Sequence, residues 1–374
     1  MRVLLTGGGT GGHVNPALAI GSVIKENDPS AVIGYVGTPN GIENKLVPKE
    51  YTMYHVDIQG IRRSLSLSNI KTAYLALTSP AKAKKIVKAF KPDIVIGTGG
   101  YVCWPVIKAA SECGVATALH ESNVVPGVAV KALLPFVDRV YVNFAETANY
   151  LKHKDKVIHV GNPLRSGFSA ISKDEARKAL GIDGKYKHVI LSYGGSLGAD
   201  KVNEAAMLLM RELTSKRSDV YHIHATGSRC YEKCRAEFDE AGLGKAENIE
   251  FADYIYDMPT KMAAADIVIS RSGAMTVSEL AMSGKCAVFI PSPNVTNNHQ
   301  YKNAKVLADA GAAILIEEKD LGGGEPLVRV IGELIGEGSD AKRAEMSTKI
   351  TDFAVRDANK RIYLDILELL NKQK

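Results

Sequence analysis

The segment VLLTGGGTGGH, residues 3–13, joins a short apolar run to five glycines within six positions. The apolar run has the length and side chains of a buried strand, and the residues from Pro16 onward have helical spacing. A strand that ends in glycines directly before a helix lets backbone N–H groups approach an anion, and the helix dipole favours negative charge there. The segment therefore predicts a parallel α/β sheet with an anion site at the end of its first strand.

The same arrangement recurs in the second half of the chain. Residues 189–196, VILSYGGS, again place an apolar run before glycines, and a helix is predicted from Lys201. A second matching pair lies at residues 93–100 and 266–273, where apolar runs end in small residues before a helix. Two Rossmann-like domains are the simplest explanation of both pairs.

Nine apolar or β-branched runs alternate with helical patterns along the chain. This alternation is typical of parallel sheets with crossover helices. The predicted strands cover residues 3–6, 31–36, 93–97, 116–120, 139–143, 189–193, 220–225, 266–270 and 287–291.

We expect the chain to divide near Gly161-Asn162-Pro163, where a strand ends in turn residues. This boundary gives an N-terminal domain of residues 1–163 and a C-terminal domain of residues 164–350. The apolar spacing between Ile350 and Leu370 predicts a last helix, residues 351–374, that packs back on the first domain. The predicted fold class is α/β, with two Rossmann-like domains whose parallel sheets face an interdomain cleft.

The composition excludes several classes of protein. A chain of 374 residues with 45% hydrophobic and 24% charged residues has the balance of a globular protein. The first strand starts at Arg2, so we expect no secretory signal, and no apolar run approaches the roughly 20 residues that cross a bilayer. Five scattered cysteines favour a reducing compartment. Cys230 and Cys234 are spaced to share a metal, but no second ligand pair lies near, so we expect ordinary packing.

The net charge of +6 is unevenly distributed. Residues 1–163 hold 18 Lys and Arg against 11 Asp and Glu, a net +7, whereas residues 164–374 come to −1. The sequence has no basic stripe with interleaved aromatic residues and no nucleic-acid-binding motif. The basic first half therefore favours an anionic membrane surface or a phosphorylated substrate over nucleic acid.

The first glycine loop has the chemistry of a diphosphate site. It contains the string GxGxxG from Gly7, but no acidic residue ends the next strand near residues 36–38, which disfavours a nicotinamide cofactor. His13 follows the loop at the start of the helix, where an imidazole would face the bound anion and could act as a general base. The alternatives are that the glycines only form a tight turn and that His13 is structural.

Two further segments place polar residues at strand ends. Glu121 and Asn123 follow the strand 116–120, so Glu121 is a competing base, or else a cap for the next segment. In the second half, Glu279 lies one to two turns into the helix after the strand 266–270, where a carboxylate can accept both hydroxyls of a ribose; the alternative is a charge near the helix start. Residues 297–300 offer amides after the strand 287–291.

Five groups of residues, in the same order along residues 1 to about 316, closely resemble the MurG family of N-acetylglucosaminyltransferases, in glycosyltransferase family 28. The groups are residues 7–13, 99–105, 120–127, 161–165 and 271–300. The resemblance implies a GT-B fold, with the acceptor in the first domain and UDP-N-acetylglucosamine (UDP-GlcNAc) held mainly by the second. It also implies inverting transfer to the muramyl C4 hydroxyl of undecaprenyl-diphosphate-linked muramyl pentapeptide (lipid I), which gives lipid II at the cytoplasmic face of the cell membrane.

The resemblance also implies site residues and partners. Glu279 would bind the ribose, Ile255 the uracil region, and Arg165 with Ser196 the diphosphate. The expected partners are UDP-GlcNAc, lipid I, an anionic membrane surface and a cell-wall synthesis complex. The implied donor-site residues are Thr10, Gly11, Gly12, Asn123, Arg165, Ser196, Ile255, Ala274, Met275, Thr276, Val277, Ser278, Glu279 and Gln300; those near the acceptor diphosphate are Gly8, Gly9, Gly99, Gly100 and Tyr101.

Two positions depart from the family pattern. The usual glutamines of Gly-Gly-Ser-Gln-Gly and His-Glu-Gln-Asn are Leu197 and Ser122 here. The contacts carried over around Ser196 and Asn123 are therefore less secure than those around Thr276 and Gln300.

Inverting transfer needs a base to take the acceptor proton while UDP leaves from the opposite face. We expect His13 to be this base, with Glu121 as the second candidate. No DxD-like pair of carboxylates appears where a metal would be expected, so we expect no essential metal and no cofactor. The alternative functions are a glycosyltransferase with a diacylglycerol-type acceptor, a sugar-nucleotide epimerase and a non-catalytic sugar-nucleotide binder.

The segment from Ile70 to Lys91 is the candidate membrane contact. Its apolar residues Tyr74, Leu75, Leu77, Ile86, Val87 and Phe90 alternate with Lys71, Lys82, Lys84, Lys85, Lys88 and Lys91. Such a segment can lie in the interface and attract anionic lipid. The alternative is an ordinary amphipathic helix packed on the sheet with a solvated lysine face.

Overall fold

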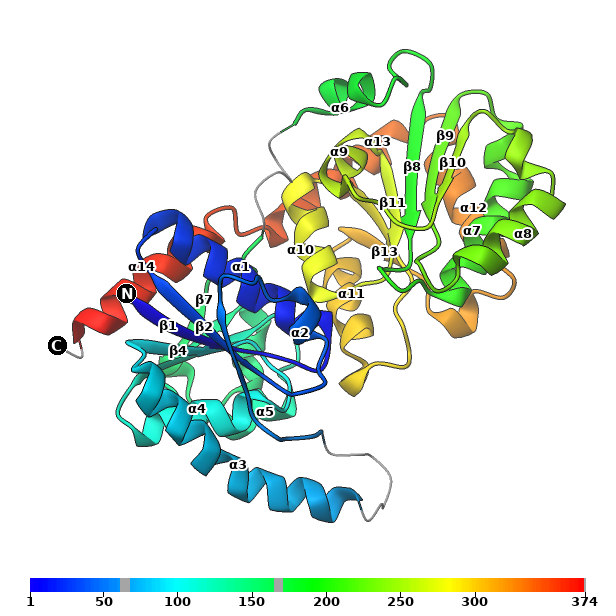
Figure 1. The fold of residues 1–374 in the computed structure, drawn as a ribbon. Coiled ribbons are helices and arrows are strands. Elements are labelled where there is room, and N and C mark those ends of the chain that lie inside the picture. The colour runs from blue at the N-terminus through cyan, green and yellow to red at the C-terminus, as the bar shows by residue number, and fades with distance from the viewer. Residues whose placement is uncertain (61–67, 165–170, 373–374) are drawn as a thin grey trace. The chain divides into compact units, whose positions relative to one another are not determined.

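The computed structural model describes residues 1–60, 68–164 and 171–372. The chain divides into two compact units, one formed by Met1–Leu164 with Val355–Lys374 and the other by Arg165–Ala354. Each unit is an α/β domain with one parallel sheet (Figure 1) and is considered by itself.

The first unit contains a seven-stranded parallel sheet in the order β3-β2-β1-β4-β5-β6-β7. Because β1 lies between β2 and β4, the loop that follows it lies between the loops after those two strands at the carboxyl edge. The strands are β1 (Arg2–Thr6), β2 (Val32–Gly37), β3 (Thr52–His55), β4 (Ile94–Gly97), β5 (Ala116–Glu121), β6 (Arg139–Val142) and β7 (Val157–His159).

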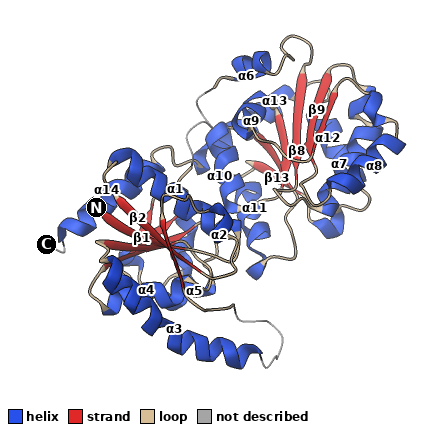
Figure 2. Ribbon diagram, in the orientation of Figure 1, coloured by secondary structure: helices blue, strands red, loops and turns tan. Residues whose placement is uncertain are grey.

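Helices cover both faces of this sheet (Figure 2). Apolar residues of α1 (Gly11–Asn27) and α14 (Ala358–Lys372) form the core on one face. Residues of α3 (Ser68–Phe90), α4 (Cys103–Glu112) and α5 (Val128–Leu133) form the core on the other. The remaining elements are short: α2 (Glu43–Leu46), η1 (Leu134–Phe136), η2 (Ala145–Tyr150) and η3 (Lys154–Lys156).

The C-terminal helix α14 is part of the first unit's core. Ile362 and Ile366 are fully buried, and the Tyr141 hydroxyl donates a 2.8 Å hydrogen bond to Asp365 Oδ2. The helix begins at Ala358, later than predicted, because residues 351–353 form a separate 3-10 turn, η8, and Val355 packs against Gly161 as the chain returns to this unit.

The second unit contains a six-stranded parallel sheet in the order β10-β9-β8-β11-β12-β13. Its strands are β8 (His188–Tyr193), β9 (Val220–Ala225), β10 (Ile249–Ala252), β11 (Ile267–Ser270), β12 (Cys286–Phe289) and β13 (Ala313–Leu315). The surrounding helices are α6 (Lys173–Ala179), α7 (Asp200–Glu212), α8 (Tyr231–Glu240), α9 (Met258–Ala264), α10 (Ala274–Ser283), α11 (His299–Asp309), α12 (Glu325–Leu334) and α13 (Asp340–Ile350), with the 3-10 turns η4 (Thr214–Lys216), η5 (Leu243–Lys245), η6 (Thr296–Asn298) and η7 (Glu318–Asp320).

The predicted start of the first helix was wrong. Helix α1 begins at Gly11, inside the glycine segment, and not at Pro16. The carbonyl of Thr10 accepts hydrogen bonds from the N–H groups of His13 and Val14, so the helical turn is already formed before Pro16. His13 therefore lies in the first turn of α1.

Helix α3 corrects part of the predicted membrane contact. Val87 and Phe90 are only 2% and 3% exposed and belong to the core, and Leu75 and Ile86 pack against that core. Lys82 and Lys84 form ion pairs with Asp57 and Glu112. Within the described residues, none of the helices combines the length and the apolar character that a bilayer crossing requires.

Candidate functional site

The glycine loop after β1 is fixed by its neighbours at the carboxyl edge of the first sheet. The Tyr35 hydroxyl donates a 2.6 Å hydrogen bond to the carbonyl oxygen of Gly7. The N–H of Gly8 donates to the carbonyl oxygen of Gly99 at 3.3 Å, which ties this loop to the loop after β4. Thr98 Oγ1 donates to the carbonyl oxygen of His13 at 2.6 Å. The two predicted glycine loops of the first unit are therefore one connected structure.

Two positions in the loop after β4 require glycine. Gly100 has φ +81°, and a Cβ atom there would lie 2.2 Å from the carbonyl oxygen of Gly8. Gly99 has φ +108°, and a Cβ atom there would lie 2.6 Å from His13 Cδ2. At either position a side chain would strain the backbone, and its Cβ would lie too close to Gly8 or to His13. These glycines permit the close approach of the two loops.

The ring of Tyr101 covers part of the first loop. A Cβ atom on Gly9 would lie 3.1 Å from Tyr101 Cε1, and Gly9 has φ +86°. The structure thus brings together the five residues expected near an acceptor diphosphate, namely Gly8, Gly9, Gly99, Gly100 and Tyr101.

His13 has a defined tautomer. Its Nδ1 lies 3.0 Å from the carbonyl oxygen of Gly8, and Thr10 Oγ1 lies 3.3 Å from the same nitrogen. Because a carbonyl oxygen only accepts, Nδ1 carries the proton, and Nε2 of the neutral ring is the basic nitrogen. Nε2 lies beside Gly99, where an added Cβ would come within 3.1 Å. The contacts of Nδ1 thus fix the ring, and the role of His13 as a general base stays a prediction.

Glu121, the last residue of β5, holds the loop that follows. Its Oε1 accepts the backbone N–H of Asn123 at 2.9 Å and the side-chain amide of Asn123 at 3.1 Å, and its Oε2 accepts the N–H of Gly127 at 2.8 Å. Burial raises the pKa of Glu121, while these hydrogen bonds act in the opposite direction. Both carboxylate oxygens are therefore engaged in shaping residues 122–127, as in the capping alternative.

His120 precedes Glu121 and is structural. It is fully buried, its Nε2 donates to the carbonyl oxygen of Gly161 at 3.0 Å, and burial lowers its pKa to about 4. The ring is neutral at physiological pH and links β5 to the end of β7.

The glycine loop of the second unit follows β8. Gly198 has φ +86°, and a Cβ there would lie 2.1 Å from the carbonyl oxygen of Thr226, so the loop packs closely on the loop after β9. The carbonyl of Ser196 accepts the N–H of Ser228 at 3.2 Å. Leu197, at the position of the family's glutamine, is 62% exposed. The departure at Leu197 therefore places an apolar side chain in solvent next to Ser196.

Helix α10 presents its amino end at the carboxyl edge of the second sheet. Its first turn holds no acidic residue, so no carboxylate of that turn offsets the positive end of the helix dipole. Glu279 is half-buried in the second turn, and its charge, together with burial as the larger cause, raises the pKa of Tyr193. Tyr193 is the last residue of β8, and the sequence analysis assigned it only to that strand.

Gln300, in the first turn of α11, connects two loops. Its Oε1 accepts the N–H of Ser292 at 2.8 Å, and its backbone carbonyl accepts the hydroxyl of Ser272 at 2.8 Å. Arg271 donates to the carbonyl oxygen of Ile290 at 2.9 Å and pairs with Glu318. These bonds hold the segments on either side of α10, which contains the six expected residues from Ala274 to Glu279.

Ile255 lies in the loop after β10 and is only 7% exposed. Its neighbours Tyr254 and Tyr256 are 43% and 87% exposed and form an edge-to-face pair with centroids 5.0 Å apart. The sequence prediction missed both tyrosines. Arg165, expected at the diphosphate, lies outside the described residues.

The described residues do not indicate a metal site. Among the residues that the structure describes, no group of three or more His, Cys, Asp and Glu side chains could hold a metal ion. Cys230 and Cys234 are both buried and reduced.

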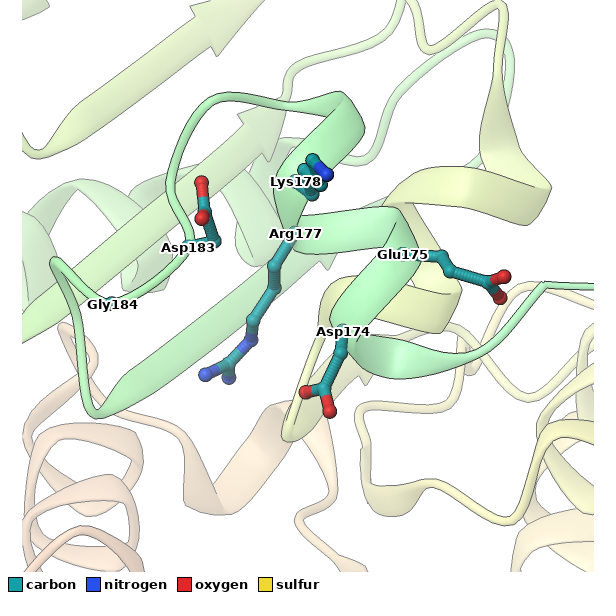
Figure 3. A pocket seen from close by; sticks show the side chains of 6 residues that line it. All are labelled: Asp174, Glu175, Arg177, Lys178, Asp183 and Gly184. Atoms are coloured by element: carbon teal, nitrogen blue, oxygen red, sulfur yellow. The ribbon is translucent and has the colours of Figure 1, made fainter.

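One surface hollow, of about 410 Å³, lies beside α6 in the second unit (Figure 3). Arg177, in its lining, pairs with Asp266, which directly precedes β11 at the amino edge of the sheet. The loops after β8 and β11 lie at the opposite, carboxyl edge. The hollow therefore lies at the edge of the second sheet opposite to the glycine loop after β8. Its lining residues are Asp174, Glu175, Arg177, Lys178, Asp183 and Gly184.

Comparison with known proteins covers both units. Residues 3–142 match the glycosyltransferase family 28 N-terminal domain, and residues 189–362 match the glycosyltransferase family 28 C-terminal domain. The chain is 40% identical to the UDP-N-acetylglucosamine--N-acetylmuramyl-(pentapeptide) pyrophosphoryl-undecaprenol N-acetylglucosamine transferase of Acetivibrio thermocellus, over 100% of this chain and 99% of that protein. It is 38% identical to the protein of the same name from Alkaliphilus oremlandii, over the full length of both. The crystal structure of Acinetobacter baumannii MurG superposes with a TM-score of 0.77 at 28% identity, covering 98% of this chain and 99% of that one.

Proposed function

Because this chain belongs to the MurG family of family 28 glycosyltransferases, we propose that it transfers N-acetylglucosamine from UDP-GlcNAc to lipid I, giving lipid II. The bond formed joins the sugar's anomeric carbon to the muramyl C4 oxygen, and the bond broken joins that carbon to UDP. The reaction inverts the anomeric centre in one displacement. The observation that carries the proposal is the hydrogen bond between Gly8, in the glycine loop proposed to bind an anion, and Nδ1 of His13, the proposed base.

In this proposal His13 Nε2 takes the proton of the acceptor hydroxyl as the new bond forms. Proton transfer by a placed base contributes about 10²- to 10⁴-fold to a rate. The alternative base, Glu121, has both oxygens engaged with backbone N–H groups. We therefore assign Glu121 to positioning Asn123 and the loop that follows, and His13 to the chemistry.

The first unit also supplies the acceptor diphosphate site. Gly8, Gly9, Gly99, Gly100 and Tyr101 surround the start of α1, whose first turn has no acidic residue. Backbone N–H groups and the helix dipole favour an anion there without any metal. Thr10, Gly11, Gly12 and Asn123 are carried over as the first unit's contribution to donor binding.

The second unit would hold UDP-GlcNAc. The amino end of α10 and the loop at Ser196 offer N–H groups to the donor diphosphate. Glu279 would accept the ribose hydroxyls, Ile255 would lie at the uracil, and Gln300 would position the segment beside the sugar. Charge that develops on the departing diphosphate is met by these dipoles and by Arg165, so we propose metal-independent chemistry without a cofactor.

The lipid-linked acceptor requires contact with a membrane surface, which we place on α3. Ile70, Tyr74 and Leu77 are 68%, 64% and 83% exposed, and their spacing puts them on one side of the helix. Lys85 and Lys88, farther along α3, are exposed and can attract anionic lipid. Figure 1 shows α3 at the outer edge of the first unit. The protein would thus act as a peripheral protein at the cytoplasmic face of the cell membrane.

The test is product formation with purified protein. UDP-GlcNAc is incubated with lipid I, with diacylglycerol, or without acceptor, and the products are separated. Lipid II formed only in the first reaction supports the proposal. Transfer to diacylglycerol would support a glycolipid synthase, a change in the sugar without acceptor would support an epimerase, and binding without any product would support a non-catalytic binder.

A further inference from the structure

Glu43 is a fully buried carboxylic acid beneath the glycine loop of the first unit. It is the first residue of α2 and has 0% exposure. Neither the predicted donor site nor the predicted acceptor site includes it. A carboxylate is costly to bury, so its retention at this place calls for a local reason.

The side chain of Glu43 fills space that three glycines leave open. A Cβ atom on Gly37 would lie 2.5 Å from Glu43 Cγ, and one on Gly41 would lie within 2.3 Å of both carboxyl oxygens. A Cβ atom on Gly8 would lie 3.0 Å from Oε1 and 3.2 Å from Cδ. The carboxyl group is therefore wedged between the loop after β2 and the residue of the first loop that contacts His13.

The two oxygens of this carboxyl group have different surroundings. Oε1 accepts the backbone N–H of Thr38 at 2.7 Å and the Thr38 hydroxyl at 2.8 Å. Oε2 is buried without a hydrogen-bond partner anywhere in the described part of the chain. The bonds to Thr38 hold the group in place beside Gly8, where it occupies the space next to the position of an added Cβ.

We infer that Glu43 is a positioning residue for the base: it supports the Gly8 peptide, whose carbonyl oxygen accepts the hydrogen bond of His13 Nδ1. The inference rests on the proposed function for its catalytic consequence. The chain of contacts runs from Thr38 to Glu43, from Glu43 to Gly8, and from Gly8 to His13. Removing the carboxyl group would leave a cavity under Gly8 and let its carbonyl turn away from the imidazole, so both tautomers would become populated.

The first experiment measures the tautomer directly. The full-length protein is labelled with ¹⁵N-histidine, and the two imidazole nitrogens of His13 are assigned by comparison with His13→Gln. We expect the Nδ1–H form in the wild type and in Glu43→Gln, which keeps the shape and an oxygen for Thr38, and a mixture in Glu43→Ala. A folded Glu43→Ala protein with an unchanged tautomer would overturn the inference.

The second experiment is a double-mutant cycle on turnover. Glu43→Ala should lower kcat by about tenfold or more with little change in the KM for UDP-GlcNAc, and should cost nothing further in a His13→Ala background. Equal losses in both backgrounds would overturn the inference. The control is Glu50→Ala, which removes an exposed carboxylate close in sequence and should leave kcat unchanged.

If Glu43→Ala does not fold, Thr38→Val serves in both experiments, because it removes the hydroxyl donor to Oε1 while preserving volume. A tautomer and kcat that both stay at wild-type values in Thr38→Val would then count against the inference. Failure of the wild type to form lipid II would refute the proposed function, whereas the tautomer measurement would still report on Glu43.

Discussion

The carbonyl oxygen of Gly8 lies 3.0 Å from Nδ1 of His13, so a residue of the first glycine loop also fixes the imidazole that follows it. The same residue donates its N–H to Gly99. The proposed phosphate site and the proposed base therefore share one short segment, and variants can perturb each of them separately.

His13→Ala should abolish most turnover. Removing the base while leaving the loop backbone intact should lower kcat by about 10²-fold or more, with a smaller effect on the KM for UDP-GlcNAc. Initial rates of lipid II formation measure this, and thermal unfolding serves as the control for folding. Full turnover in a folded His13→Ala protein would leave the loop as an anion site but remove the base.

Gly100→Ala should lower kcat more than an alanine at another glycine with a positive φ. Its Cβ would collide with the Gly8 carbonyl at 2.2 Å, so the two loops must separate. Gly114 also has a positive φ, +70°, but has nothing within 4 Å of an added Cβ. Gly114→Ala should therefore cost only about 1 kcal/mol of backbone strain and keep kcat.

Comparison of these two variants separates strain from collision. The measurements are kcat for lipid II synthesis and the free energy of unfolding in urea. Similar losses of kcat in both variants would show that loop separation is not the cause.

The sheets could be predicted from the sequence because their central strands are buried on both faces. The strands β1, β4 and β8 each contain three consecutive aliphatic residues (VLL, IVI and VIL), a pattern typical of parallel strands covered by helices. The sequence reading assigned bounds to none of the four edge strands, β3, β7, β10 and β13. Their residues are mostly half-buried or exposed, so neither an apolar run nor strict alternation marks them.

The candidate site was predictable only where the signal is local. Glycines before a helix mark the loop and the place of His13. The sequence left Glu121 open between a base and a cap, and only the fold of residues 122–127 shows that both of its oxygens accept backbone N–H groups. Glu43 is separated from Gly8 by α1 and β2, so only the folded sheet brings the two together.

Membrane binding should depend on the apolar side of α3. Replacing Ile70, Tyr74 and Leu77 by Ser removes exposed apolar area, and should weaken sedimentation with vesicles that contain anionic lipid. The matched control is Leu364→Ser, which changes a 52% exposed leucine on α14, the helix over the other face of the sheet. Equal binding of the triple variant and the control would exclude α3 as the contact.

A second membrane variant tests the charge. Lys85→Glu with Lys88→Glu should reduce vesicle binding at low salt, with a smaller difference at high salt, because exposed charges are screened. Turnover with a short-chain, water-soluble acceptor should be unchanged in both membrane variants. A loss of that turnover would place α3 at the active site instead of the membrane.

Chelation should not affect the reaction. Helix ends and backbone N–H groups carry the proposed diphosphate contacts, so rates of lipid II formation should be equal with excess EDTA and with added Mg²⁺. Loss of turnover with EDTA that Mg²⁺ restores would contradict metal-independent transfer.

Buried histidines should make the protein sensitive to acid. Burial lowers the pKa of His120 to about 4, of His222 to about 3 and of His224 to about 4, all below the unfolded value of 6.5. Between these values the unfolded state binds more protons than the folded state, so stability is fully present above about pH 6.5 and is lost as the pH falls. From about pH 7 to about pH 5 each histidine should cost roughly 2 kcal/mol.

The second unit holds two of these histidines, joined through Ser192, whose Oγ lies 2.8 Å from His222 Nε2 and 2.7 Å from His224 Nδ1. His222→Gln should lower the free energy of unfolding near neutral pH because it disturbs this chain. It should also make the free energy of unfolding fall less between about pH 7 and about pH 5, by about the contribution of one buried histidine. Urea unfolding of both proteins at about pH 7 and about pH 5 measures the two slopes, and identical slopes would show that His222 does not titrate on unfolding.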